Sequence, residues 1–270
     1  MQHTRTVVVV PCFNEAGRLD VLSFHRAVQA DDLLDLVFVD DGSEDGTHAV
    51  LQTMASEARG RITVLALNEN AGKAAAVRAG MQASLHPPYR YAGFFDADLA
   101  TPLDEVVHMR ALLEDDPACL AVFASRVKLL GLDIRRRPSR HYVGRAGATL
   151  ISLVCGLPVY DTQCGAKLFR VGEAVGRVFD TPFVSRWLFD VEILARCRKE
   201  TSGAYLDGPP SVREMPVRHW HDVPGSKVGV GDYARGLLDL ARIYSHYRRL
   251  DSIRSGRVRT ALSGQVGRKM

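Results

Sequence analysis

Two carboxylates stand one residue apart in the sequence Asp96-Ala97-Asp98, which continues a hydrophobic stretch. The hard cations Mg²⁺ and Mn²⁺ prefer such oxygen ligands and share their coordination shell with substrate phosphates. An Asp-X-Asp sequence is common by chance, but its position at the end of a predicted buried strand makes it more specific. We therefore expect Asp96 and Asp98 to hold Mg²⁺ or Mn²⁺ against a phosphorylated substrate.

Stretches rich in β-branched and aromatic residues predict strands in the first 126 residues, with helical stretches between them. The strands are expected at residues 6–12, 36–40, 62–67, 91–96 and 120–125. This alternation predicts a parallel α/β sheet with right-handed connections, in which ligands collect at the carboxyl ends of the strands. Carboxylates or an arginine follow four of these strands, at Glu15, Asp40-Asp41, Asp96-Asp98 and Arg126. The sequence therefore predicts one polar edge of the sheet.

The starts of the intervening helices are predicted from residues that commonly cap helices. Asn14 is expected to cap the first helix and Thr47 the second. Thr101-Pro102 is expected to begin a helix that runs to about residue 114.

The 270 residues carry a net charge of +4, but the two halves of the chain differ strongly. Residues 1–125 hold 9 Lys/Arg and 18 Asp/Glu, a net charge of −9, whereas residues 126–270 hold 26 and 13, a net charge of +13. An acidic half suits metal cations and a basic half suits anionic substrates. A nucleic-acid-binding module is disfavoured, because the acidic half would repel nucleic acid and the basic stretches lack interleaved aromatic residues.

Composition and motifs exclude several other classes. Hydrophobic residues make up 46% and charged residues 24%, which excludes a disordered or collagen-like chain. Gly72-Lys73 precedes Ala74 rather than Ser or Thr, so it does not form a phosphate-binding P-loop, and no Gly-X-Gly-X-X-Gly follows a strand. The five cysteines lack zinc-site spacing and suit a reducing cytosol. We expect no signal peptide, and the longest apolar run, residues 146–160, is shorter than the ~20 residues that span a bilayer.

The basic second half is expected to contain helices near residues 141–155 and 187–199, a strand near 212–220 and a helix at 232–247. On the last helix an apolar face is formed by Leu237, Leu240, Ala241 and Tyr244. This face could pack against the protein or lie on a membrane surface. The second alternative is favoured by residues 248–270, which carry seven basic residues and one acidic and are expected to form a mobile tail.

Several segments resemble family 2 inverting glycosyltransferases of the GT-A fold. In the first half they are VVVVPCFNE (7–15), VFVDDGSEDGT (37–47), NAGKAAAVRAGM (70–81) and FFDADLATP (94–102). A narrower branch, the polyprenyl-phosphate (dolichyl-phosphate) β-glucosyltransferases, is resembled by DTQCGAKLF (161–169), SRWLFDVEIL (185–194) and WHDVPGSKV (220–228). The resemblance covers roughly residues 6–245.

The resemblance implies a Rossmann-like, mostly parallel sheet flanked by helices, with a C-terminal acceptor-binding extension. Residues 1–126 would form the nucleotide-sugar-binding half and residues 127–247 the acceptor-binding half of one continuous domain, followed by the tail at 248–270.

The resemblance also implies roles for the residues that match the family's motifs. On the donor side, the nucleoside, uridine, would be held by Pro11, Glu15 and Asp41, with Asp40 beside them. The diphosphate would be approached by Lys73 and Lys227, and the metal that it carries would be held by Asp96 and Asp98.

On the acceptor side, the implied binding residues are Arg140, Arg145, Arg186 and Trp187, and the implied catalytic residues are Asp98, Arg126 and Asp190. For Trp187, packing in the core and lining the site both stay open.

The implied activity is metal-dependent inverting transfer of a hexose, glucose, from a UDP-sugar to a polyprenyl phosphate at the cytoplasmic membrane face. A phosphate acceptor is already anionic and needs no strong general base, whereas a hydroxyl acceptor would need one, with Asp190 or Glu192 as candidates. The alternative is a soluble family 2 enzyme acting on a small hydroxylated or phosphorylated acceptor, as in natural-product biosynthesis. Ala166, where the family has an aromatic residue, and the lack of an expected transmembrane helix favour it. We expect a cytoplasmic protein, with peripheral membrane contact through residues 232–270 as an open alternative.

Overall fold

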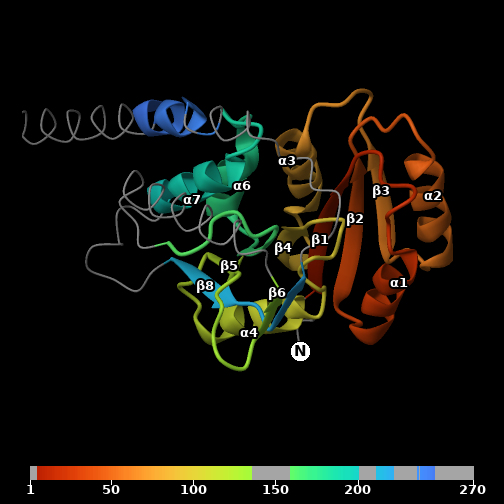
Figure 1. The fold of residues 1–270 in the computed structure, drawn as a ribbon, viewed down its shortest axis with the longest axis horizontal. Helices are drawn as coiled ribbons and strands as arrows, with labels where there is room; N and C mark the ends of the chain where they lie inside the picture. The colour runs from red at the N-terminus through yellow and green to blue at the C-terminus, as the bar shows by residue number, and fades with distance from the viewer. Residues whose placement is uncertain (1–4, 136–158, 201–210, 222–235, 237, 247–270) are drawn as a thin grey trace, which may run out of the picture.

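The computed structural model describes residues 5–135, 159–200, 211–221, 236 and 238–246, and Figure 1 shows helices on both faces of a central sheet. The strands are β1 (Arg5–Cys12), β2 (Leu34–Asp40), β3 (Ile62–Ala66), β4 (Tyr89–Phe95), β5 (Ala121–Ser125), β6 (Asp133–Arg135), β7 (Ala166–Arg170), β8 (Val212–Pro216) and β9 (His219–His221). The labelled helices are α1 (Val21–Ala30), α2 (Thr47–Glu57), α3 (Lys73–Ser84), α4 (Glu105–Asp115), α6 (Glu173–Asp180) and α7 (Phe189–Glu200).

The main sheet has the strand order β3-β2-β1-β4-β7-β5-β8. All neighbouring strands are parallel except β7, which is antiparallel to both β4 and β5. Strands β6 and β9 form a separate parallel pair. The prediction of an α/β, mostly parallel sheet is confirmed, together with the five strands expected in the first half.

The valines of β1 show why that strand is a continuous apolar run. Val8 and Val10 pack in a core cluster with residues of α1, α2 and α4, whereas Val7 and Val9 pack in a second cluster with residues of α3, α6 and α7. Both faces of β1 are therefore covered by helices, as expected for a central strand of a parallel sheet. Helix α3 approaches closely at Gly80, where a Cβ atom would lie 2.4 Å from Cγ1 of Val9.

The start of α1 differs from the prediction. The helix begins at Val21, and Asp20 caps it by accepting a hydrogen bond from the backbone N–H of Ser23. Asn14, the predicted cap, instead adopts a positive φ of 52°, and its side chain accepts a hydrogen bond from the backbone N–H of Glu44. The cap prediction was wrong because Asn14 ties the loop after β1 to the loop after β2.

The starts of α2 and α4 are shifted for similar reasons. Thr47 is the first residue of α2 rather than its cap, and its hydroxyl accepts a hydrogen bond from the backbone N–H of Glu15. Helix α4 begins at Glu105, not at Thr101-Pro102. The loop before α2 is therefore one residue shorter than predicted, whereas the loop between β4 and α4 is longer.

The second half contains three elements that were not predicted, β6, β7 and α6. The helix expected at 187–199 is confirmed as α7, whereas the strand expected at 212–220 is two strands, β8 and β9. The helix expected at 141–155 and the tail at 248–270 lie outside the described residues.

The described part of the C-terminal helix, residues 236 and 238–246, packs against the start of α7. Leu240 and Ile243 are buried there, whereas Tyr244 and Ala241 are exposed. The predicted apolar face was therefore right for Leu240 and wrong for the other two described members. Among the described residues, no helix combines the length and the apolar character that a bilayer crossing requires.

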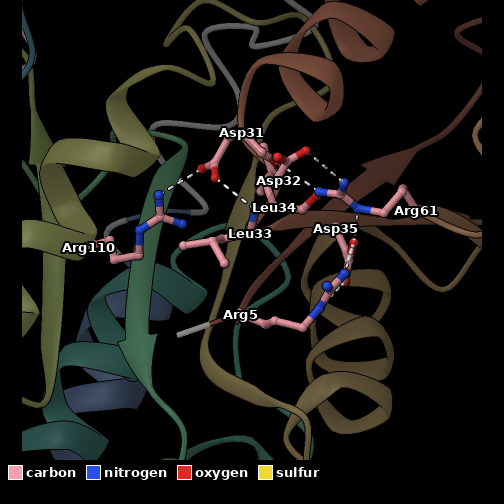
Figure 2. A network of polar contacts seen from close by, with 8 residues as sticks. All are labelled: Arg5, Asp31, Asp32, Leu33, Leu34, Asp35, Arg61 and Arg110. Atoms are coloured by element: carbon pink, nitrogen blue, oxygen red, sulfur yellow. Dashed lines mark hydrogen bonds and ion pairs between the residues drawn. The ribbon is translucent and has the colours of Figure 1, made fainter. Parts of the chain in front are cut away.

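An ion-pair network ties the elements together at the amino ends of β1 and β2 (Figure 2). Asp35 pairs with Arg5, with 2.5 Å between Oδ2 and Nη2, and with Arg61, with 2.5 Å between Oδ1 and Nε. Asp31, just before β2, pairs with Arg110 of α4, with 2.8 Å between Oδ2 and Nη2. These contacts fix the edge of the sheet opposite to the one where ligands are expected.

We predict that Asp35→Ala lowers the free energy of unfolding by about 2–4 kcal/mol, because two arginines lose the carboxylate that they share. Urea denaturation followed by circular dichroism measures this. Asp32→Ala is the matched control: Asp32 lies 4.0 Å from Arg61 but its side chain is 99% exposed, so no measurable change is expected. Equal losses in the two variants would contradict the prediction.

Candidate functional site

The loops that follow β1, β2 and β4 meet the start of α3 at one edge of the sheet. The backbone N–H of Asn14 donates to Oγ of Ser43 at 3.0 Å, which joins the loops after β1 and β2. Asp41, after β2, binds the backbone just before α3. Lys73, the first residue of α3, reaches Asp96 at the end of β4. The predicted polar edge is therefore present, and its parts are connected by direct contacts.

The Asp96-Ala97-Asp98 segment forms a turn directly after β4. The backbone N–H of Asp96 donates to the carbonyl of Gly165 at 2.9 Å. Leu99 has a positive φ of 50°, and the backbone N–H of Ala100 donates to Oδ1 of Asp98 at 3.1 Å. The turn leaves Asp98 exposed and Asp96 partly buried, so two carboxylates project from one short turn.

Gly165, directly before β7, makes room for the Asp96 carboxylate. A Cβ atom at Gly165 would lie 2.0 Å from Oδ2 and 2.2 Å from Cγ of Asp96. Because those atoms belong to a side chain, an alanine here would displace the carboxylate rather than the backbone. The position of the Asp96 carboxylate therefore depends on a glycine that is distant in the sequence.

Lys73 places a positive charge beside Asp96 at this edge. Its Nζ atom lies 2.5 Å from Oδ1 of Asp96, and its side chain is about half exposed. Desolvation by the surrounding loops would lower the pKa of Lys73, but the carboxylates of Asp96, Asp190 and Asp98 outweigh it and raise the pKa above its ordinary value. Lys73 is therefore a fixed positive charge among carboxylates.

Asp41 fixes the loop that leads into α3. Its carboxylate accepts hydrogen bonds from the backbone N–H groups of Ala71, at 2.9 Å, and Gly72, at 2.8 Å. Burial raises the pKa of Asp41, although these two bonds and the charge of Arg186 lower it. Gly72 has a positive φ of 91°, and a Cβ atom there would lie 2.8 Å from Nε of Arg186. The predicted donor residue Asp41 and the predicted acceptor residue Arg186 thus meet at one loop.

Asp40 has its hydrogen-bond partners in the loop after β2 and in α2. Its Oδ1 atom accepts a hydrogen bond from the backbone N–H of Ser43 at 3.0 Å, and Oδ2 lies 3.0 Å from Nδ1 of His48. Both aspartates of the Asp40-Asp41 pair thus accept hydrogen bonds from the chain's own backbone N–H groups. Glu15 lies at the same edge, where its carboxylate is 3.6 Å from Nε of Arg18.

Asp190 enters the site from the first turn of α7. Its Oδ1 atom lies 2.6 Å from Nζ of Lys167, a fully buried residue of β7. Burial raises the pKa of Asp190, while Lys167 and Lys73 lower it and Asp96 raises it further. Glu192, the other candidate base, has both carboxylate oxygens bound to other groups. Its Oε1 atom lies 2.8 Å from Nη2 of Arg196, and its Oε2 atom accepts a hydrogen bond from the backbone N–H of Val184.

Arg126, at the end of β5, is held by a bidentate ion pair. Its Nε and Nη2 atoms lie 2.6 and 2.8 Å from the two carboxylate oxygens of Asp161. The backbone N–H of Asp161 donates to Glu214 at 2.8 Å, and the Arg126 guanidinium lies 5.4 Å from the ring centroid of Trp220. The Arg126 side chain is thereby fixed between the segment before β7 and Trp220 of β9.

The remaining predicted residues fall into two groups. Pro11 lies in β1 opposite Val39 of β2, and Trp187 packs against Gly236, where a Cβ atom would lie 2.6 Å from Cζ3 of the indole. This contact joins Trp187 to the C-terminal helix. The other predicted residues, Arg140, Arg145 and Lys227, lie outside the described part of the chain.

Two carboxylates on one turn fit a divalent cation of the Mg²⁺ or Mn²⁺ type. No cluster of three or more His, Cys, Asp or Glu side chains that could hold a metal occurs among the described residues. Mg²⁺ commonly binds through one or two carboxylates and takes its other ligands from substrate phosphates and water. The space left by Gly165 and the cation already present at Asp96 agree with that mode of binding.

Three residues of the site were missed by the sequence reasoning: Asp161, Gly165 and Lys167. All three lie in the segment DTQCGAKLF, which matched a family motif but gave no local signal of contact with Asp96, Arg126 or Asp190. A lysine between hydrophobic residues in a short strand was the available signal for Lys167.

Comparison with known proteins gives one family match and many relatives. A family model described as "Glycosyl transferase family 2" matches residues 7–174. A dolichyl-phosphate beta-glucosyltransferase of Homo sapiens is 34% identical over 238 residues, which cover 82% of this chain and 68% of the relative. One from Trichomonas vaginalis is 29% identical over 255 residues, which cover 90% of this chain and 72% of the relative.

Among solved structures, glucosyl-3-phosphoglycerate synthase from Mycobacterium tuberculosis superposes with a TM-score of 0.64 at 16% identity, covering 90% of this chain and 81% of that one. Another structure of that synthase, in complex with Mn²⁺, UDP-glucose and phosphoglyceric acid, gives a TM-score of 0.62 at 16% identity, with 90% and 80% covered. This likeness shows that the chain has the same fold.

We predict that Gly165→Ala weakens Mn²⁺ binding in the presence of UDP at least tenfold while the fold survives, because the new methyl group displaces the Asp96 carboxylate. Electron paramagnetic resonance of free and bound Mn²⁺ measures this. Gly176→Ala is the control, since nothing lies within 4 Å of a Cβ atom there. Unchanged Mn²⁺ affinity in Gly165→Ala would show that the Asp96 carboxylate does not hold the metal.

Proposed function

The chain belongs to glycosyl transferase family 2, and we propose that it transfers glucose from UDP-glucose to a polyprenyl phosphate with the help of a divalent cation. It is a glycosyltransferase, and several of its relatives are dolichyl-phosphate beta-glucosyltransferases that match most of the chain. The observation that carries the proposal is the edge where Asp41, Lys73, Asp96, Asp98 and Asp190 converge.

The donor would bind at the loops after β1, β2 and β4. Asp41 holds the backbone before α3 in place, so Lys73 starts the helix at a fixed point beside Asp96. The amino terminus of a helix and a lysine both favour negative charge, which suits a diphosphate. In this proposal Pro11 and Glu15 line the uridine, and Arg186, which lies over Gly72, closes the site above the diphosphate.

Breaking the bond between the sugar and the diphosphate leaves negative charge on the departing UDP. A divalent cation held by Asp96 and Asp98 would supply Lewis-acid neutralisation of that charge. Lys73 adds a second positive charge at the same place, and charge that is already in position stabilises the transition state without reorganisation.

The acceptor would attack from the face of the sugar opposite to the diphosphate, which inverts the anomeric centre. A phosphate oxygen is anionic, so it needs no strong base for this attack. Arginine suits such an acceptor because its planar fork binds two phosphate oxygens at once. Arg186 is an exposed arginine at the described part of the site, and Arg140 and Arg145 stay predictions for the same role.

Peripheral contact with a membrane is part of the proposal. The loop after β5 carries Leu129 and Leu130, both well exposed, next to Lys128. Exposed leucines beside a cation suit an anionic lipid surface, which would present the polyprenyl phosphate to the site.

A direct assay tests the donor and the acceptor together. UDP-glucose, UDP-N-acetylglucosamine and GDP-mannose are each offered with polyprenyl phosphate, with and without Mn²⁺, and glycolipid products are separated by chromatography. We expect β-glucosyl polyprenyl phosphate from UDP-glucose, and its loss with a chelator. Transfer only to a small soluble phosphorylated or hydroxylated acceptor would favour the alternative activity and overturn the lipid acceptor.

We predict that Asp98→Asn lowers kcat at least about 100-fold, since charge stabilisation of this kind is commonly worth 10²–10³ in rate. Its melting temperature should stay that of the unchanged protein, because Asp98 is exposed. Asp115→Asn, an exposed residue at the end of α4, is the control and should transfer glucose at the normal rate. If Asp98→Asn transferred glucose with the normal kcat even after a chelator had removed the metal, the proposed role of Asp98 in holding a catalytic cation would be wrong.

We also predict opposite effects of Lys73→Met on the two ligands. Without the ammonium beside Asp96, Mn²⁺ alone should bind about tenfold tighter, whereas UDP should bind about tenfold more weakly because a charge against its phosphates is lost. Calorimetric titration of each ligand separately measures this, with Lys199→Met of α7 as a control. If Lys73→Met bound both Mn²⁺ and UDP more weakly, the metal would not compete with the Lys73 ammonium for Asp96, and the prediction would be wrong.

A further inference from the structure

Lys167 is a buried charge that the proposed reaction does not use. It lies in β7 between β4 and β5, and its exposed fraction is 0%. Its Nζ atom lies 2.8 Å from the carbonyl oxygen of Cys164 and 2.6 Å from Oδ1 of Asp190. Burying an ammonium is costly unless a carboxylate and hydrogen-bond acceptors compensate it. Such a residue in the middle of a sheet therefore calls for an explanation.

Aromatic rings complete the surroundings of the Lys167 ammonium. The ring centroids of Phe94 and Phe123, on the two neighbouring strands, lie 5.3 and 5.0 Å from Nζ. Rings at this distance stabilise a cation through their electron-rich faces. The ammonium is thus held from both sides, and among the described residues Asp190 is the carboxylate that pairs with it.

Asp190 connects this buried cation to the donor edge. Charged groups face it from three elements: Lys167 of β7, Lys73 of α3 and Asp96 after β4. The Nζ atom of Lys73 lies 2.5 Å from Oδ1 of Asp96 and 5.9 Å from the ring centroid of Phe189, the residue before Asp190. Charges of alternating sign therefore run from the core of the sheet to its edge in the order Lys167, Asp190, Lys73, Asp96.

We propose that Lys167 is a positioning residue of the glycosyltransferase site: it keeps Asp190 ionised and in place, and through Asp190 it keeps Lys73 at the diphosphate. The proposal rests on the proposed function, because it assigns to Lys73 the diphosphate of a nucleotide. When the donor engages Asp96, Lys73 loses that partner, and Asp190 is the carboxylate that still holds it in the site. Without Lys167, Asp190 would lose the buried ammonium that pairs with it, and burial would favour its protonated form.

The test compares the pH dependence of UDP binding in Lys167→Met, Asp190→Asn and the unchanged protein. Binding is measured by calorimetry with Mn²⁺ present between pH 5.5 and 8.5. Titration of UDP itself is common to all variants and cancels. Since removal of Lys167 makes Asp190 easier to protonate, the loss of affinity on the acid side should move up by at least one pH unit in Lys167→Met. KM for UDP-glucose at pH 7 should rise about tenfold, with a smaller change in kcat.

Arg196→Met is the matched control. Arg196 forms the other buried ion pair of α7, with Glu192 at 2.8 Å, and it also donates to the carbonyls of Val178 and Thr181. Its loss should lower the melting temperature while the pH dependence of UDP binding stays unchanged. If Arg196→Met shifts the acid side as much as Lys167→Met does, the effect belongs to the stability of α7 and the proposal is wrong. A folded Lys167→Met with the normal pH dependence would overturn it as well.

If Lys167→Met does not fold, the double variant Lys167→Met/Asp190→Asn decides the question, because it replaces the ion pair with two uncharged groups. The double variant should bind UDP as Asp190→Asn alone does, since Lys167 acts only through Asp190. Weaker binding than in Asp190→Asn would overturn the proposal. Failure of the unchanged protein to glucosylate polyprenyl phosphate would overturn the proposed acceptor but not the role of Lys167, because UDP titration requires no acceptor.

Discussion

The structure depends on the balance of charge at one edge of its sheet. Parallel strands deliver Asp41, Asp96 and Asp98 to this edge, and α7 adds Asp190. Carboxylates so close together repel each other and resist burial, so the fold must supply cations or backbone N–H groups to match them. It does so with fixed partners, which leaves the edge organised before any substrate arrives.

The partners differ in how firmly they are held. Asp41 is satisfied by backbone N–H groups and Asp190 by the buried ammonium of Lys167, so both are permanent parts of the framework. Lys73 and Asp96 form an ion pair in which both side chains are partly exposed. In the proposed reaction this pair would separate, with Lys73 at the diphosphate and Asp96 at the cation, while Asp41 and Asp190 would keep their partners.

The sequence alone predicted the parallel first half and the carboxylates at its strand ends, because both follow from local alternation and from the geometry of parallel strands. Prediction from the sequence failed where contacts between distant segments of the chain determine the role of a residue. Asn14 and Thr47 serve as links between loops rather than caps, and the partner of Arg126 is Asp161, 35 residues away. The role of Lys167 could not be predicted from the sequence, because it depends on Asp190, Phe94 and Phe123, which lie in other elements. The family resemblance identified the motif at residues 161–169 but not the ion pair between Lys167 and Asp190.

The antiparallel strand β7 has a consequence for the order in which the protein is built. It is inserted between β4 and β5 although it follows both in the chain, so β5 and β8 can join the sheet only after β7 has paired. During synthesis, the strands β3-β2-β1-β4 can assemble first, with β4 as an open edge that invites unwanted pairing. Because Lys167 lies in β7 and Gly165 directly precedes that strand, the same pairing that joins β4 to β5 also brings these two residues to the site.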